Sequence, residues 1–247
     1  MKSSKVTNNG FHCYKTEGKV AILIDGGFFL KRVNRLCKPE DRNNVASVTR
    51  FINILCTEHA KRLNQHIYRV FFYDCPPFEM GLHNPLSEKF IKFKESPLYK
   101  FKMELFEELR TMRKMALRLG RLNYDSSWKI APGKITDLLK KRITVDDLNP
   151  EIDVQPCFRQ KQVDMKIGID IASMVLKQQV QTIVLVAGDG DFVPASKFAR
   201  REGVDFILDP LWAPINPDLH EHVDGIQTVL FKKKKREKHS KGMECYG

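Results

Sequence analysis

The sequence contains no C-x-x-C pair, although it has six cysteines, namely Cys13, Cys37, Cys56, Cys75, Cys157 and Cys245. Cysteines spaced this far apart indicate neither a zinc ribbon nor a disulfide framework, so we expect reduced, partly buried thiols. His220 and His222 lack the H-E-x-x-H spacing of a zinc hydrolase. The sequence therefore offers no pattern for a zinc site.

Long hydrophobic runs are also missing. No apolar run approaches the length of a membrane-spanning helix, and the N-terminus MKSSKVTNNG lacks the hydrophobic core of a signal peptide. We therefore expect an intracellular, cytoplasmic protein with no membrane partner. Hydrophobic residues make up 42% and charged residues 29% of the 247 positions, which argues against global disorder and predicts a substantial core.

Acidic residues are scarcer than basic ones, 30 against 42, which gives a net charge of +12. Residues 232–247 hold seven basic and two acidic residues, and this tail is a solvated disordered end by default, with an RNA tether, a membrane-surface contact or a nuclear address as alternatives. A basic body with a basic tail suits a polyanion such as nucleic acid.

Short apolar runs alternate with helical segments along most of the chain. The runs at 19–24, 67–73, 183–186 and 204–208 are typical of strands in a parallel sheet, and helices are expected at 26–36, 44–62, 161–177 and 195–202. This alternation predicts an α/β fold with a parallel, doubly wound sheet. We divide the chain into a flexible lead-in at 1–18, one domain at 19–231 with a helical insertion around 81–160, and the basic tail.

Within the insertion, the pattern is less regular. A long helix is expected at 97–117, a strand at 116–122, a helix and loop at 128–149, and a short strand at 154–158. Basic side chains gather in the first half of this segment, and with two further lysines they form the candidate nucleic-acid surface: Arg110, Arg113, Lys114, Arg118, Arg121, Lys161 and Lys166. A solvated helix face is the favoured interpretation of the first five.

Carboxylates follow two of the predicted strands. Asp25 comes directly after 19–24, and the stretch TIVLVAGDGDFVP places Asp189 and Asp191 after 183–186. Because ligands bind at the carboxyl edge of open α/β sheets, we expect these acids at one site. Gly188 and Gly190 are expected to allow a sharp turn there. Asp191 has a structural alternative, as the N-cap of the next helix.

A third carboxylate begins the helix expected at 161–177. At 100° per residue, Asp164 projects onto the face formed by the apolar positions Ile167, Ile171, Met174 and Val175. There it requires a cation or hydrogen-bond donors, and N-capping is its alternative role. Asp170, about 9 Å along the helix axis, and Asp74, after the strand 67–73, are candidate supporting acids.

A cluster of carboxylates without a basic partner requires a divalent cation. All-oxygen ligands favour Mg²⁺ or Mn²⁺, which can acidify a bound water and orient a phosphodiester. We therefore assign Asp25, Asp164, Asp189 and Asp191 as candidate catalytic residues and metal ligands.

These segments resemble the NYN domain family, specifically its LabA-like branch within the PIN-like nuclease superfamily. The matching pieces are VAILIDGGFFL at 20–30, FFYD at 71–74, ALRLG at 116–120, KQVDMKIGIDIA at 161–172 and VLVAGDGDFVP at 184–194. The resemblance implies a Rossmann-like three-layer α/β/α sandwich with a mainly parallel central sheet, and metal-dependent cleavage of RNA. It also implies that the four candidate aspartates are metal ligands or their immediate partners, and that Asp170 is a recurring family acid.

The chain departs from the family at one point. Many members carry an asparagine two or three places after the first aspartate, where this chain has Gly27 and Phe28. Asn34 is a candidate replacement. The departure bears on catalytic strength more than on fold.

The leading hypothesis is a Mg²⁺- or Mn²⁺-dependent ribonuclease that acts by hydrolysis on RNA, with single-stranded DNA as a second candidate substrate. The alternative is a nucleic-acid-binding regulatory module with weak or no catalysis. A phosphatase for small phosphorylated compounds is less favoured, since Asp25-Gly26-Gly27 lacks the second aspartate of a D-x-D nucleophile loop. The sequence leaves open the RNA preference, internal or terminal cleavage, and a homo-oligomeric state.

Overall fold

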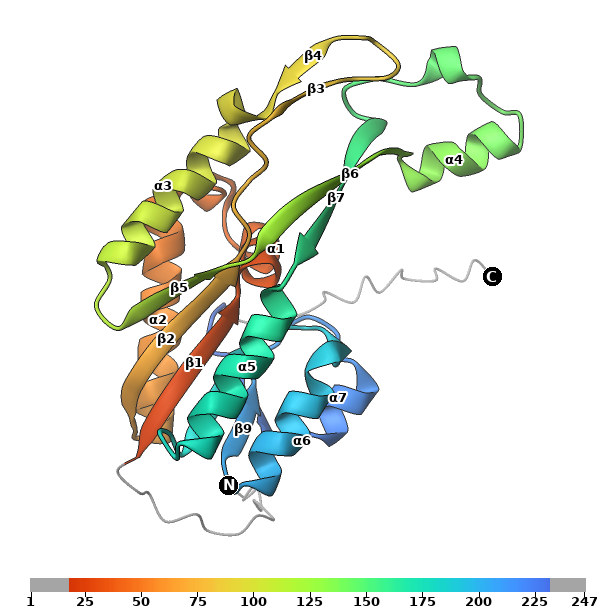
Figure 1. Cartoon of the computed structure of the whole chain (residues 1–247). Coiled ribbons are helices and arrows are strands. Elements are labelled where there is room, and N and C mark those ends of the chain that lie inside the picture. Colours follow the sequence, from red (N-terminus) through yellow and green to blue (C-terminus); the bar gives the residue numbers. More distant parts are fainter. Residues whose placement is uncertain (1–17, 232–247) are drawn as a thin grey trace, which may run out of the picture.

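The computed structural model describes residues 18–231, so the predicted lead-in and basic tail lie outside the described residues. At its centre is a six-stranded sheet with the order β10-β9-β8-β1-β2-β5, in which every neighbouring pair is parallel (Figure 1). The strands are β1 (Lys19–Asp25), β2 (His66–Asp74), β5 (Met115–Leu119), β8 (Thr182–Val186), β9 (Asp205–Leu208) and β10 (Gly225–Ile226). The predicted α/β class with a parallel central sheet is confirmed.

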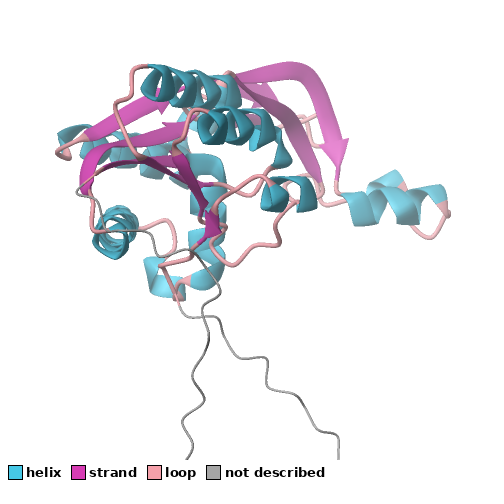
Figure 2. Cartoon of the chain, turned by 90° about the horizontal axis from the view of Figure 1, so that it is seen from below, coloured by secondary structure: helices cyan, strands magenta, loops and turns pink. Residues whose placement is uncertain are grey.

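Helices cover both faces of this sheet (Figure 2). Side chains of α1 (Gly26–Leu36), α2 (Val45–Leu63) and α3 (Pro97–Thr111) share one buried cluster with Val20, Ile22 and Ile24 of β1. On the opposite face, α5 (Val163–Leu176), α6 (Val193–Arg201) and α7 (Pro217–Glu221) share a second cluster with Ala21 and Leu23. Alternate residues of one strand thus feed two cores, which makes the fold a three-layer α/β/α sandwich.

The central strands are apolar throughout because both of their faces are covered. All five residues of β8 are buried, as are the five residues at 20–24 in β1. The helix at 161–177 has the predicted buried face, with Ile167, Ile171, Met174 and Val175 packed on the sheet. The apolar pattern of the sequence therefore correctly predicted which strands are covered on both faces and which face of the helix packs on the sheet.

The main deviations lie between β2 and α5. The long helix predicted at 97–117 ends at Thr111, and the chain turns through Lys114, at φ 65°, into β5. The strand predicted at 116–122 is two strands, because Gly120 separates β5 from β6 (Arg121–Ile130). At Gly120 a Cβ atom would lie 2.5 Å from the carbonyl oxygen of Lys161, so the chain crosses there at a distance that only glycine allows.

The region for which a helical insertion was expected, around 81–160, contains strands as well as helices. β3 (Gly81–His83) and β4 (Phe90–Lys92) form one antiparallel pair, and β6 forms another with β7 (Val154–Lys161). α4 (Pro132–Leu139) lies between β6 and β7. We call residues 121–161 the arm, since they project from the sandwich (Figure 1).

Several short turns complete the chain. Single 3₁₀ turns occupy Pro39–Asp41, Phe93–Glu95, Val145–Asp147 and Gly190–Phe192. The strand predicted as the last of the core, β9, is followed by β10, which extends the sheet by one short strand. None of the helices within residues 18–231 is long and apolar enough to cross a membrane. The four cysteines in that range are free, as predicted: Cys37, Cys56 and Cys75 are buried and Cys157 is half-buried.

Candidate active site

The carboxyl ends of β1 and β8 are neighbours in the sheet. Ile24 pairs with Val186, so Asp25 at the end of β1 lies beside the start of the loop that carries Asp189. Asp25 also forms the N-cap of α1, where its Oδ1 accepts a hydrogen bond of 3.1 Å from the backbone N–H of Phe28. This hydrogen bond holds the carboxylate at the edge of the sheet.

Asp164 reaches the same edge from another element. It lies in the first turn of α5, immediately after the arm returns to the sandwich, and its side chain is exposed. Burial raises the pKa of Asp164, and the negative charges of Asp189 and Asp191 raise it further. The pKa of Asp25 rises from 3.8 to about 6, chiefly through burial, against the lowering effect of the Phe28 N–H, with added repulsion from Asp164 and Asp74. The structure thus places Asp164 within electrostatic reach of each of the other three candidate aspartates.

These carboxylates are near one another without forming a closed coordination shell. Among residues 18–231, no three His, Cys, Asp or Glu side chains converge closely enough to hold a metal ion by themselves. The donor chemistry is nevertheless that of a hard cation, since every candidate ligand is a carboxylate oxygen. Their mutual repulsion is the property that a divalent cation would relieve.

Close packing against neighbouring side chains, rather than unusual backbone angles, explains the two glycines in the loop after β8. Asp189, and not Asp191, acts as the cap, and its Oδ1 accepts a hydrogen bond of 3.3 Å from the Asp191 N–H. Gly203 is the one glycine with positive φ in the described chain, so neither Gly188 nor Gly190 takes a left-handed conformation. Instead, a Cβ at Gly188 would lie 2.5 Å from the Phe28 ring, and one at Gly190 would lie 2.5 Å from the Asn216 amide.

A pocket of about 560 Å³ opens beside Asp25 and Asp189. Three polar side chains that the sequence did not reveal line it: Lys31, Gln160 and Asn216. Lys31 lies on α1 four residues after Gly27, a helical spacing that was available as a signal. Asn216 is the N-cap of α7 and precedes Pro217, a pattern that was also available in the sequence. Gln160 had no such signal, because its position depends on the return of the arm.

The supporting acid Asp74 is fully buried at the end of β2. Its Oδ1 accepts hydrogen bonds from Lys102 Nζ at 2.8 Å and from the Cys75 N–H at 2.7 Å. Its Oδ2 has no hydrogen-bond partner within the described chain. Asp74 thus shares the field of Asp25 while it is held by Lys102.

Asp170 does not join the four aspartates at the edge. Its Oδ2 accepts hydrogen bonds from the Tyr73 hydroxyl at 2.9 Å and from Arg118 Nε at 3.0 Å. Burial, followed by the Asp170 carboxylate, raises the pKa of Tyr73 well above its ordinary value. Asp170 therefore links α5 to β2 and β5. Its contact Tyr73 pairs with Asp25 in the β1–β2 register.

The basic residues predicted as one surface are distributed over the molecule. Arg110, Arg113 and Lys114 lie at the end of α3 and in the turn before β5, which is the amino edge of the sheet. Arg118 forms an ion pair with Asp170, and the amino group of Lys166 donates to the Leu119 carbonyl at 2.9 Å.

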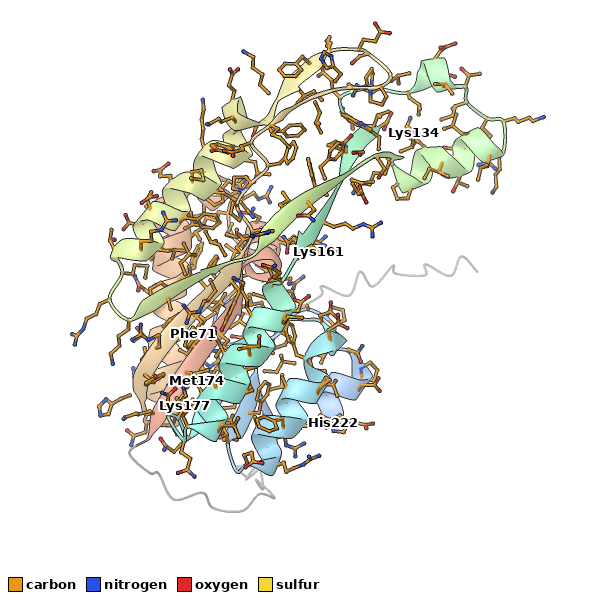
Figure 3. The ribbon with its side chains drawn as sticks, in the orientation of Figure 1. Phe71, Lys134, Lys161, Met174, Lys177 and His222 are labelled. Atoms are coloured by element: carbon orange, nitrogen blue, oxygen red, sulfur yellow. The ribbon has the colours of Figure 1, made fainter. Side chains whose placement is uncertain are left out.

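Lys161 lies at the base of the arm, where β7 meets α5 (Figure 3). Arg121 pairs with Lys161 in the β6–β7 register. Asn34, proposed as a replacement asparagine, instead donates to Asn43 at 2.8 Å and does not line the acidic pocket.

Comparisons with known proteins give three findings. No curated protein matches the chain. The crystal structure of a protein of unknown function from Vibrio parahaemolyticus aligns with 86% of this chain and 93% of that chain, at 15% identity and a TM-score of 0.44.

The family model of the NYN domain covers the part of the chain that carries three of the four aspartates. The matched segment begins within β6 and ends after β9, so it includes α5 with Asp164 and the loop with Asp189 and Asp191, but not β1 with Asp25. The LabA-like branch stays a prediction. Residues 125–214 are thus similar to the NYN domain family, as the sequence motifs predicted.

Proposed function

We propose that this chain is a metal-dependent ribonuclease that hydrolyses RNA phosphodiester bonds at the carboxyl edge of its sheet. The observation that carries the proposal is the cluster of Asp25, Asp164, Asp189 and Asp191, drawn from three elements, in which burial and then mutual repulsion raise the pKa of Asp25 and Asp164. A stable fold tolerates such repulsion where function requires it. The similarity of residues 125–214 to the NYN domain, a nuclease-like family, supports the same class.

Mg²⁺ or Mn²⁺ fits this group of residues. The carboxylates of Asp25, Asp164, Asp189 and Asp191 would hold the ion, and their open spacing suits a cation that keeps several waters and binds only one or two carboxylates directly. When bound, the ion supplies positive charge to a phosphate group and lowers the pKa of water.

The remaining groups of the pocket fit a phosphodiester. Lys31 contributes a cationic side chain to the lining, and Gln160 and Asn216 contribute amide donors. A phosphate oxygen that accepts from these groups would be held against the carboxylate side of the same pocket. The Phe28 ring, packed against Gly188, gives the pocket an apolar wall.

The experiment that tests the proposal is cleavage of a labelled RNA and a matched DNA by metal-stripped protein, with and without Mn²⁺. We expect cleavage only with the metal, and its loss in Asp189→Asn. Asp205→Asn is the matched control, because it makes the same chemical change at the start of β9, on the opposite edge of the sheet. Cleavage that survives both chelation and Asp189→Asn would contradict the proposal.

Lys31→Ala should reduce kcat/KM for RNA about tenfold, mainly through KM, because it removes a phosphate contact rather than a carboxylate. It should also lower the dependence of log Kd on log salt by about one contact. Lys31→Arg should retain most activity, and Lys197→Ala, at an exposed position of α6, is the control. An unchanged salt slope and KM in Lys31→Ala would remove Lys31 from the substrate site.

A regulatory RNA-binding module is the second candidate. It is favoured by the open spacing of the acids and by Gly27 and Phe28 at the positions of the family asparagine. RNA binding without product in Mn²⁺ would support this module over the nuclease.

A further inference from the structure

A second pocket lies beside the acidic one, on the far side of β2. It has a volume of about 420 Å³, within the range of roughly 300–1,000 Å³ of small-molecule sites. The loop after β2 forms its base, α3 forms one wall and the start of the arm forms the other. We call it the aromatic pocket and define it by Pro77, Phe78, Tyr99, Met103, Arg121 and Asn123.

The order and register of the strands place the ends of β1, β2 and β5 next to one another. Asp25 pairs with Tyr73 across β1 and β2, and Asp74 pairs with Leu119 across β2 and β5. The loops that form the aromatic pocket leave β2 and β5 directly after these residues. Two strand spacings, about 10 Å, therefore separate the end of β1, which carries Asp25, from the end of β5, which leads into the aromatic pocket. A nucleoside attached to a phosphate at Asp25 extends over a comparable distance.

The apolar part of the aromatic pocket is held rigidly. The Phe78 ring packs against Phe158 at a centroid distance of 4.9 Å, Phe93 at 5.4 Å and Tyr124 at 5.9 Å. Rings fixed in this way present a flat surface at little entropic cost, which is what stacking of a planar ligand requires.

The polar groups of the aromatic pocket are free to bind a ligand. Among the side-chain hydrogen bonds and ion pairs of residues 18–231, none involves the Tyr99 hydroxyl, the Arg121 guanidinium or the Asn123 amide. A guanidinium and a carboxamide offer the donors and acceptors that read base edges, and an arginine plane also stacks on bases. Among residues 18–231, one carboxylate lines the pocket, that of Glu79.

We propose that the aromatic pocket binds one nucleobase of the RNA strand whose phosphate lies at the acidic edge. This proposal rests on the proposed function and names a base-binding subsite within it. The base stacks between the Pro77–Phe78 loop and Tyr99, and its edge faces Arg121 and Asn123. A proline-containing peptide also suits an apolar, aromatic-lined pocket, but the nearby phosphate site favours the base.

The test is a thermodynamic cycle on RNA binding, measured by fluorescence anisotropy in EDTA so that no cleavage occurs. A short oligoribonucleotide is compared with a series in which each position in turn is abasic. For the wild-type chain, we expect one position at which loss of the base weakens binding about tenfold. Tyr99→Ala should weaken binding of the intact RNA by a similar factor, and should lose nothing further with the RNA that is abasic at that position.

Two further variants make the result specific. Arg121→Ala should behave as Tyr99→Ala does, which covers the case in which the tyrosine variant folds poorly. Leu98→Ala, at the neighbouring and exposed position of α3, should bind both RNAs as the wild type does. A flat abasic scan, or losses that add between Tyr99→Ala and the abasic position, would overturn the subsite while the nuclease proposal stands. If RNA is neither bound nor cleaved, both proposals fail.

Discussion

Asp25→Asn is expected to reduce RNA cleavage by on the order of 10³-fold, equivalent to about 4 kcal/mol of transition-state stabilisation. The same substitution should raise the free energy of unfolding of the metal-free protein at pH 7.5 by about 1–3 kcal/mol. Both effects have the same cause. The Asp25 carboxylate is buried beside other carboxylates, an arrangement that serves catalysis and lowers stability. Asparagine keeps the N-cap to α1, so the local fold should persist.

The sign of the pH dependence follows from the direction of the shift. The pKa of Asp25 is about 6 in the fold and close to 3.8 in the unfolded chain. Between these values the folded state binds more protons, so the contribution of Asp25 to stability is most favourable below pH 4 and is lost as the pH rises through 6. The advantage of Asp25→Asn should therefore be large at pH 7.5 and close to zero at pH 4.

Chemical denaturation of both proteins at pH 4.5, 6 and 7.5, with and without Mn²⁺, measures this effect. Mn²⁺ should stabilise the wild type at pH 7.5 and have little effect on Asp25→Asn, because the ion compensates the charge that the variant lacks. Asp205→Asn should cleave RNA normally. Equal stability of the Asp25 variant and the wild type at every pH would show that the carboxylate is not under strain.

The layers of the fold were readable from the sequence because each depends on a local pattern. Runs such as 183–186 are apolar at every position, and only a strand covered on both faces requires that. The placement of Asp25, Asp189 and Asp191 at one edge followed, since parallel strands expose their carboxyl ends together. Asp164 followed from its place at the start of its helix, whereas its predicted position on the buried face is wrong because its side chain is exposed.

The arm and the distribution of the basic residues were not readable, because both depend on contacts distant in sequence. Within β6, apolar positions such as Tyr124 and Trp128 alternate with polar ones, but the pairing register shifts between these two residues, with Ser126 at φ 55°. Asp125, Ser126 and Ser127 place three polar residues in a row at this shift, which hides the alternation on which a strand prediction rests. The apparent basic cluster was adjacent in sequence only, since a turn at Lys114 places its members at opposite edges of the sheet.

Lys102→Met is expected to lower the free energy of unfolding by about 3–5 kcal/mol, the cost of leaving a buried charge without its partner. Lys102 Nζ lies 2.8 Å from Asp74 Oδ1, with the Asp74 side chain fully buried and that of Lys102 15% exposed. After the substitution, the one hydrogen bond left to the Asp74 carboxylate within residues 18–231 is that from the Cys75 N–H. Methionine preserves the length of the side chain, so the loss reports on charge rather than on packing.

Urea denaturation of Lys102→Met, Asp74→Asn and the double variant separates the two contributions. Asp74→Asn/Lys102→Met should recover much of the loss, because the neutral amide no longer requires a counter-charge in the core. Lys100→Met, at an exposed position of the same helix, should change stability little. A loss below about 1 kcal/mol in Lys102→Met would place the pair among ordinary surface ion pairs. The larger loss would show that the ion pair between Lys102 and Asp74 stabilises the packing of α3 on the end of β2. The Asp74 carboxylate in this pair also contributes to the raised pKa of Asp25, after burial.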